Sequence, residues 1–368
     1  MNLLSLDPAG GGVTTYALEL AGALHARSDI RLEVLATAEV ERLLRARFGH
    51  QTPPVSQLRS ARRARLRYAA TLFGGVPIAA RRLGVDVLHS PTNFGPARAF
   101  GIPCVATVHD VIWAQVGEDW GSAAAIREMR LLSRATVPRM RRVITDSEAS
   151  RAEIMRVLGV EASRIEVIPL GVAAVEGAQD PPGDIRERLG IGPGEIVLCV
   201  AQKRPYKGHA DLIRAVARVP TPVQLVLPGA PTPYEAVLRD LARSCGIADR
   251  VQFPAWLEQQ ELDALYRAAT CVVLPSSIEG FGLPALEAMA RSVPVACSGV
   301  GALAEASGSA ALHFAPLDVD AIAAAISTLV DDESARRQLV HAGRARAAEF
   351  TWARTAELTV AAYRRAIG

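Results

Sequence analysis

Short β-branched runs alternate with longer stretches of helical periodicity from one end of the chain to the other. This alternation is typical of doubly wound parallel α/β sheets. In the first half the pattern predicts strands near residues 2–6, 31–36, 86–89, 103–108, 143–145 and 165–168. In the second half it predicts strands near residues 196–200, 223–227, 250–253, 271–274, 294–297 and 311–314. The Ala-, Gly- and Pro-rich segment 172–184 lies between the halves and reads as a linker.

The pattern therefore predicts two Rossmann-like domains, residues 1–172 and residues 173–351, facing one another across a cleft. Open α/β sheets bind ligands outside the carboxyl ends of their strands, so we expect functional residues directly after strands. The closing segment 352–368 carries a partial apolar stripe at helical spacing, which predicts a helix that must be buried.

Composition fits a folded protein with a large core. Half of the 368 residues are apolar, only 21% are charged and the net charge is +3, which excludes a disordered chain. No run reaches the roughly 18 to 20 apolar residues of a spanning helix, and the N-terminus lacks the features of a signal peptide. The five cysteines show no CxxC spacing, which favours a reducing cytoplasm and argues against structural zinc.

Positive charge is concentrated in the first half, where residues 1–172 carry 22 arginines against 16 acidic residues. Much of this excess lies in Arg59 to Arg67 (RSARRARLR), which could contact anionic lipid at the inner face of a membrane or a phosphate-bearing acceptor. A solvated helix face explains the same run. Nucleic acid is disfavoured because no nucleic-acid-binding motif accompanies it.

A glycine loop follows the first predicted strand. Gly10, Gly11 and Gly12 open a helix, and their lack of side chains would let an anion approach the free amides at its N-terminus. The loop matches neither GxGxxG nor a P-loop. A flexible turn before a helix remains the alternative.

The strongest local signal is SSIEGFGLPALEAMA, residues 276–290. Pro284 suits the first turn of a helix, which places Glu279 in the preceding loop and Glu287 about one turn inside. The free amides of Phe281, Gly282 and Leu283 would then face an anion ahead of the helix. A nucleotide sugar offers three matching groups: sugar hydroxyls, a diphosphate and a ribose diol.

A second group of candidates lies in VAQKRPYKGHADL, residues 200–212, after the first strand of the second half. Lys203 and Lys207 are the only lysines among 41 basic residues. Arg204 and Lys207 are our candidates for neutralising a diphosphate leaving group.

Two further groups of candidate residues lie next to predicted elements, one after a strand and one before a helix. His109 stands at the carboxyl end of the strand CVATV, with Asp110 beside it. Asp318 and Asp320 form a DVD motif like that of metal-dependent glycosyltransferases of the GT-A fold. They also directly precede a helical run, where a helix cap and a first-turn carboxylate account for both without a metal.

The segment EGFGLPALEAMA resembles the signature of glycosyltransferase family four, retaining enzymes of the GT-B fold. Other motifs of that family occur in its order along essentially the whole chain: GGV (11–13), HSPTNFGP (89–96), TVHD (107–110), ITDSEAS (144–150), VIPLGV (167–172) and VQFPAW (251–256). The closing TWARTAELTVAAYRRA also fits, and in the resembled fold the last helix crosses back onto the first domain.

The resemblance implies that Glu279 bonds donor-sugar hydroxyls, that the amides of Gly280, Phe281, Gly282 and Leu283 hold sugar and phosphate, and that Glu287 binds the ribose. It implies that His109 lies near the reacting sugar. Gln202, Arg204 and Lys207 resemble the QxRxxK loop of mannosyl-transferring members.

We therefore expect a retaining hexosyltransferase, and we favour mannose as the transferred sugar. Its donor would be GDP- or UDP-linked, its acceptor a glycan or a lipid-linked saccharide bound to the first domain. No cofactor or metal is expected. Two rivals remain, a non-catalytic nucleotide-sugar-binding protein and a sugar-nucleotide epimerase or phosphorylase on the same fold. Same-face attack and a covalent intermediate both stay open.

Overall fold

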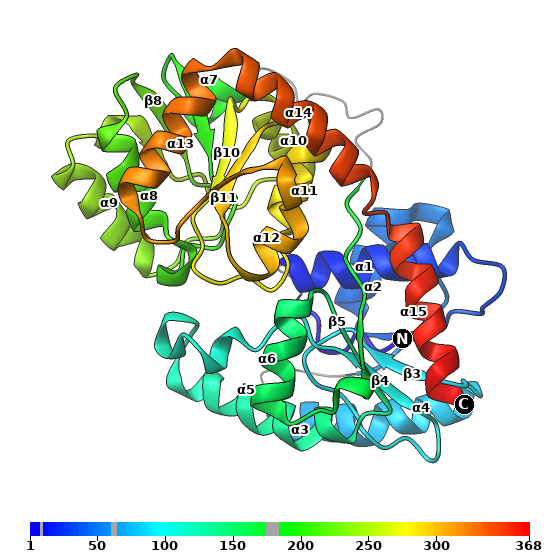
Figure 1. Cartoon of the computed structure of the whole chain (residues 1–368). Coiled ribbons are helices and arrows are strands. Elements are labelled where there is room, and N and C mark those ends of the chain that lie inside the picture. Colours follow the sequence, from blue (N-terminus) through cyan, green and yellow to red (C-terminus); the bar gives the residue numbers. More distant parts are fainter. Residues whose placement is uncertain (8–9, 60–64, 174–183) are drawn as a thin grey trace. The chain divides into compact units, whose positions relative to one another are not determined.

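The computed structural model describes residues 1–7, 10–59, 65–173 and 184–368. The chain forms two compact units (Figure 1). Unit 1 comprises Met1–Gly117, Gly121–Gly171 and Thr351–Gly368, and unit 2 comprises Glu118–Trp120 and Val172–Phe350. Most of the predicted linker 172–184 lies outside the described residues.

Unit 2 contains a six-stranded parallel sheet with the order β12-β11-β10-β7-β8-β9. Its strands are β7 (Glu195–Leu198), β8 (Val223–Val226), β9 (Val251–Gln252), β10 (Cys271–Leu274), β11 (Val295–Ser298) and β12 (Leu312–Phe314). All six strands predicted for the second half are confirmed. The strands β8, β10 and β11 are buried along their whole length, as expected for a parallel sheet covered on both faces.

Helices cover both faces of this sheet (Figure 1). One layer holds α8 (His209–Arg218), α9 (Tyr234–Ser244) and α13 (Val319–Asp331), and α8 packs on both of the others. The other layer includes α11 (Leu283–Ala290), which packs on α12 (Gly301–Ser307) and α14 (Glu333–Ala348). The remaining helices of unit 2 are α7 (Ile185–Leu189) and α10 (Gln259–Ala268).

Strand order reverses in this sheet between β7 and β10. The chain runs outward from β7 through β8 to β9, returns to the other side at β10, and continues to β11 and β12. The loops after β7 and β10 therefore leave the sheet side by side in opposite directions. Such a switch point opens a crevice at the carboxyl edge of the sheet.

Unit 1 is built in the same way from a two-stranded and a four-stranded parallel sheet. The strands are β1 (Val34–Ala36) paired with β2 (Val55–Gln57), and β3 (Leu88–Ser90), β4 (Cys104–Thr107), β5 (Arg142–Thr145) and β6 (Ile165–Val167) in sequence order. Asn2 bridges β1 in parallel at Leu35 and donates its amide to the His89 carbonyl of β3 at 2.7 Å. The N-terminal segment thus lies between the two sheets.

Two expectations for unit 1 need correction. The strand predicted at 2–6 is reduced to the bridge at Asn2, because a turn follows at once: the Asn2 side chain accepts from the Leu4 amide at 3.2 Å. Strand β2 was not predicted, since its sequence VSQ is short, polar and only partly buried. The other five strands of the first half are confirmed, with boundaries shifted by up to three residues.

The helices of unit 1 include α1, which begins at the glycine loop, and α15, which closes the chain (Figure 1). Their bounds are α1 (Gly12–His25), α2 (Ala38–Phe48), α3 (Arg65–Ala70), α4 (Val76–Leu83), α5 (Ala123–Thr136), α6 (Glu148–Leu158) and α15 (Trp352–Ile367). Helix α15 packs on α1, β4 and β5. Its Tyr363 hydroxyl lies 2.7 Å from Nδ1 of His89, and its Thr355 hydroxyl donates to the Pro169 carbonyl at 2.8 Å. The predicted closing helix therefore belongs to the core of unit 1.

Among the described residues, no helix is long and apolar enough to cross a membrane.

Candidate active site

The loop after β7 and the loop after β10 are in direct backbone contact. The Ser277 amide donates to the Tyr206 carbonyl at 2.9 Å. Gly208 has a φ of 72°, and a Cβ atom there would lie 2.4 Å from the Pro275 carbonyl oxygen. Only glycine fits this approach, because the backbone conformation and the space both exclude a side chain. The two loops are thus held together at the switch point.

This contact brings Lys207 and Glu279 together. The Lys207 Nζ donates to Glu279 Oε2 at 2.7 Å, and the Ser276 hydroxyl donates to Glu279 Oε1 at 2.7 Å. Both members of the ion pair retain some exposure, 14% for Lys207 and 15% for Glu279. Two residues 72 positions apart, selected separately from the sequence, therefore form one polar cluster.

The two lysines of this loop have different surroundings. The Lys203 side chain is fully buried, donates to the Gly229 carbonyl at 2.8 Å and pairs with Glu235 at 3.2 Å. Lys203 is thus a structural residue that ties the loop to the end of β8. The environment of Arg204 differs from that of both lysines. Its Nε atom is buried and has no hydrogen-bond partner among the described residues. An unpaired buried donor is costly unless an external acceptor reaches it.

Helix α11 begins where the sequence predicted. Gly282 precedes it with a φ of 106°, and a Cβ atom there would lie 2.7 Å from Cδ1 of Leu303. Pro284 occupies the first turn, so Glu279 and Gly280 lie in the preceding loop and Leu283 opens the helix. The Phe281 ring is buried and meets Phe350 edge-on at 5.9 Å, so this residue offers only its backbone to a ligand.

Glu287 lies one turn inside α11 and is held by residues that the sequence did not single out. The buried Tyr266 hydroxyl donates to Glu287 Oε2 at 3.0 Å. Arg291 covers the Tyr266 ring at 5.0 Å and pairs with Asp263. Burial raises the pKa of Glu287 above its ordinary value, while the positive charge of Arg291 opposes that rise.

Only Arg291 could have been inferred from the sequence, since it stands four residues after Glu287 on one helix face. Tyr266 and Asp263 belong to α10, and only the packing of α10 beside α11 brings them to Glu287.

In unit 1 the glycine loop leads into α1 as expected. Gly11 is the residue before the helix, with a φ of 111° that favours glycine. A Cβ atom at Gly11 or Gly12 would meet no atom of the described part of the chain within 4 Å. No side chain among the described residues caps the helix.

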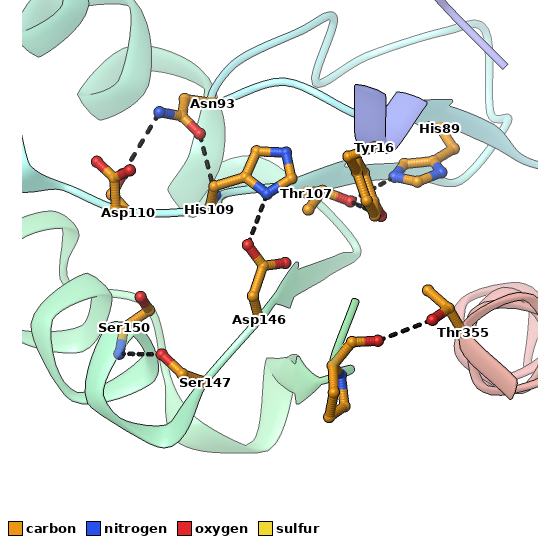
Figure 2. A network of polar contacts seen from close by, with 11 residues as sticks. Tyr16, His89, Asn93, Thr107, His109, Asp110, Asp146, Ser147, Ser150 and Thr355 are labelled. Carbon is orange, nitrogen blue, oxygen red and sulfur yellow. Dashed lines mark hydrogen bonds and ion pairs between the residues drawn. The ribbon is translucent and has the colours of Figure 1, made fainter. Parts of the chain in front are cut away.

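His109 follows β4 and takes part in the polar network of unit 1 (Figure 2). Its Nδ1 lies 2.7 Å from Oδ2 of Asp146, and its backbone amide donates to Oδ1 of Asn93 at 3.1 Å. Tyr16 of α1 meets the His109 ring edge-on at 4.6 Å. The Asp110 carboxylate accepts from the Ile112 amide at 3.0 Å and caps the following turn.

Asp318 and Asp320 are engaged in local structure. Asp318 is the N-cap of α13 and accepts from the Ala321 amide at 2.9 Å, while the exposed Asp320 pairs with Arg218. Their arrangement is that of a helix cap with a first-turn carboxylate, the second of the two interpretations of the DVD motif.

Comparison with known proteins agrees with this architecture. The model described as Glycosyltransferase Family 4 matches residues 10–175, and the model described as Glycosyl transferases group 1 matches residues 183–346. An MMP alpha-(1->4)-mannosyltransferase of Mycolicibacterium hassiacum is 32% identical over 360 residues, covering 91% of this chain and 80% of the relative. A D-inositol 3-phosphate glycosyltransferase of Acidothermus cellulolyticus is 33% identical over 308 residues, covering 77% and 67%.

Solved structures share the fold over nearly the whole chain. Sucrose-phosphate synthase from Thermosynechococcus elongatus has a TM-score of 0.77 at 24% identity and covers 99% of this chain and 97% of its own. Anabaena HepE, solved in complex with UDP and glucose, has a TM-score of 0.75 at 22% identity and covers 98% and 97%.

Two Rossmann-like units of this topology form the GT-B fold that the chain shares with these solved structures. The chain belongs to the family 4 glycosyltransferases, as the two family models and the 32% identical mannosyltransferase show.

The contribution of the contact between the two loops to stability can be tested by substituting Gly208. Gly208→Ala should lower the free energy of unfolding by considerably more than Gly246→Ala, measured by urea denaturation. Gly246 is the matched control, because its φ of 69° is nearly that of Gly208 while a Cβ there meets nothing within 4 Å. Backbone strain alone costs about 1–2 kcal/mol at either position. Equal losses in the two variants would show that the loops do not need this contact.

Proposed function

We propose that the protein transfers a hexosyl group from a nucleoside-diphosphate sugar to a hydroxyl acceptor, with retention at the anomeric carbon. The observation that carries this proposal is the Lys207–Glu279 pair at the switch point of unit 2. A cation that can meet a phosphate and a carboxylate that can meet sugar hydroxyls lie 2.7 Å apart there. A nucleotide sugar has the same two groups next to each other, on either side of the bond that breaks.

Charge stabilisation of the leaving diphosphate falls to Arg204, Lys207 and the first amides of α11. The unpartnered Arg204 Nε and the open N-terminus of α11 are positioned in unit 2 before any ligand arrives. Donors fixed where negative charge develops stabilise a transition state without reorganising. Departure of the nucleoside diphosphate from the anomeric carbon is therefore the step these groups assist.

The remaining candidates orient the substrates. Glu279 would accept hydrogen bonds from the sugar hydroxyls once Lys207 turns to phosphate, and Glu287 would accept from the ribose diol. His109 would contact a hydroxyl of the reacting sugar, and the glycine loop at Gly11 and Gly12 would let the donor or the acceptor approach the backbone. We assign no side chain as a covalent nucleophile.

Mannose is our preferred sugar, and GDP and UDP donors are both reasonable. The QxRxxK loop supports this preference, as do two relatives with mannosyltransferase names. The second of these is the O-antigen chain mannosyltransferase B of Escherichia coli, 29% identical over 284 residues. The acceptor would be a glycan or a lipid-linked saccharide. A panel of GDP- and UDP-hexoses, assayed for release of nucleoside diphosphate with and without saccharide acceptors, tests the proposal directly.

Donor affinity should depend on the ionisation of Glu287. Because burial raises the pKa of Glu287, its acceptor form is lost as pH falls through that raised pKa. Calorimetry with the donor should show affinity falling on acidification, and Glu287→Gln should bind at least about tenfold more weakly at alkaline pH with little pH dependence. Glu349→Gln, at an exposed carboxylate of unit 2, is the control. Unchanged binding by the Glu287 variant would remove this assignment.

Turnover should not need a divalent metal, because Arg204, Lys207 and the α11 amides carry the charge stabilisation. Activity should survive exhaustive EDTA treatment, and Asp318→Asn should behave like the untreated enzyme apart from a small loss of stability. Activity lost in EDTA and restored by manganese or magnesium would return Asp318 and Asp320 to consideration as metal ligands.

We also propose reversible attachment of unit 1 to anionic lipid around α3. Residues 60–64 of the arginine run lie outside the described residues, but Arg59 and Arg67 are exposed, and Leu66 between them is 89% exposed. Basic residues near an anionic surface contribute about 1 kcal/mol each. Sedimentation with anionic vesicles at low salt should exceed that with neutral vesicles and weaken in Leu66→Ser. Leu131→Ser, 60% exposed on α5, is the control. Equal sedimentation with both vesicles would contradict the proposal.

A further inference from the structure

The motif ITDSEAS contributes a residue to the surroundings of His109 that its sequence position alone does not reveal. Strands β4 and β5 are parallel neighbours, and Thr107 lies opposite Ile144 in their register. Two residues further along each strand stand His109 and Asp146. Because parallel strands leave a sheet at the same edge, the register places these two side chains next to each other at the carboxyl end.

The contact between them, drawn in Figure 2, is short, and both residues are buried. Nδ1 of His109 lies 2.7 Å from Oδ2 of Asp146, with the residues 7% and 2% exposed. Tyr16 bounds the ring on another side, and Asn93 fixes its backbone amide. Asp146 and Tyr16 thus contact the ring, and the Pro91 backbone lies near enough to favour its protonated form, while Nε2 is buried and forms no well-aligned hydrogen bond among the described residues.

Burying the His109–Asp146 pair carries a free-energy cost for folding. A carboxylate buried beside one histidine must give up its hydration, and Oδ1 of Asp146 has no partner among the described residues. A buried polar pair with one unsatisfied atom on each member contributes little stability. The same arrangement serves a substrate well, since it orients an imidazole and leaves one nitrogen available.

We propose that Asp146 is a positioning residue for His109: it accepts the Nδ1 proton, fixes that tautomer, and leaves the Nε2 lone pair to accept a hydrogen bond from a substrate hydroxyl. The inference rests on the proposed function, in which His109 contacts the reacting sugar. A carboxylate that selects the tautomer of a histidine acts on the reaction through that histidine alone.

Four ionisable groups face or influence the His109 ring: Asp146, Asp110, Tyr16 and His89. Burial lowers the pKa of His109, but the Asp146 carboxylate, with smaller contributions from Asp110 and the Pro91 backbone, outweighs burial and raises that pKa above its ordinary value. Burial lowers the pKa of His89 to about 3 and raises that of Tyr16, so both stay neutral. The neutral, accepting form of His109 is lost as pH falls through its raised pKa.

Replacing the carboxylate by its amide tests this role with little change of shape. Asp146→Asn should lower kcat about 10- to 100-fold with the donor KM nearly unchanged. Because the variant loses the charge that raised the pKa of His109, the acid limb of its pH–rate profile should move to lower pH. A residue that only packed would not move that limb. A variant with kcat within twofold of the parent and an unmoved limb would overturn the proposal.

A double-mutant cycle shows whether Asp146 acts through His109. Asp146→Asn should have almost no further effect in a His109→Gln background. Glu153→Gln, an exposed carboxylate on α6, is the control and should leave kcat and the profile unchanged. Equal losses from Asp146→Asn in both backgrounds would show an independent role and contradict the proposal. Melting temperatures of all variants identify any that lose activity by unfolding.

Nitrogen-15 NMR of histidine-labelled protein separates this inference from the proposed function. The chain has seven histidines, and the resonance missing from His109→Gln belongs to His109. At alkaline pH we expect a protonated Nδ1 and an unprotonated Nε2, and a mixture of tautomers in Asp146→Asn. An Nε2-protonated ring in the parent would overturn the inference whatever the activity. The expected tautomer in a protein that transfers no sugar from any donor would instead refute the proposed function.

Discussion

The reversal of strand order between β7 and β10 is the constraint on which the candidate donor site depends. It places two loops from distant parts of the chain next to each other at the carboxyl edge of one sheet. Backbone contact at Gly208 and Ser277 then fixes their separation, and the Lys207–Glu279 pair follows from it. No property of either loop alone would produce that pair. The sheet fixes the positions of the two loops, and the loops carry the candidate functional side chains.

Unit 1 also brings a nitrogen group and a carboxylate together at the ends of neighbouring strands, with different residues. The register of β4 and β5 brings His109 to Asp146, as the order of β7 and β10 brings Lys207 to Glu279. In both units a cationic or ionisable nitrogen meets a carboxylate at a strand end, partly or fully shielded from water. Polar groups in such places cost stability, and folds tolerate them where a ligand completes their hydrogen bonding.

The Lys207–Glu279 and His109–Asp146 pairs differ in their exposure to water, and we propose different roles for them on this basis. Lys207 and Glu279 retain some exposure, and in the proposed function each exchanges the other for a substrate group. His109 and Asp146 are too enclosed for such an exchange, so Asp146 keeps its partner while Nε2 remains available. Glu287 is intermediate: the Tyr266 hydroxyl occupies one oxygen and orients the other. In the proposed function, three carboxylates of similar intrinsic chemistry thus have three different tasks because their surroundings differ.

The sequence by itself determined the fold class, eleven of the twelve strands at their places, and the side chains at the strand ends. It could do so because β-branched runs, Pro284 and the positive-φ glycines act locally, within a few residues of their own position. It missed β2, whose short polar sequence carries no periodic signal, and it overextended the first strand past Asn2. Tertiary structure alone decided that Lys203 is buried while Lys207 meets Glu279, that Tyr266 holds Glu287, and that Asp146 reaches His109. These pairings depend on which strands and helices become neighbours, and that choice is made by burying the apolar faces of the whole unit rather than by the residues that meet.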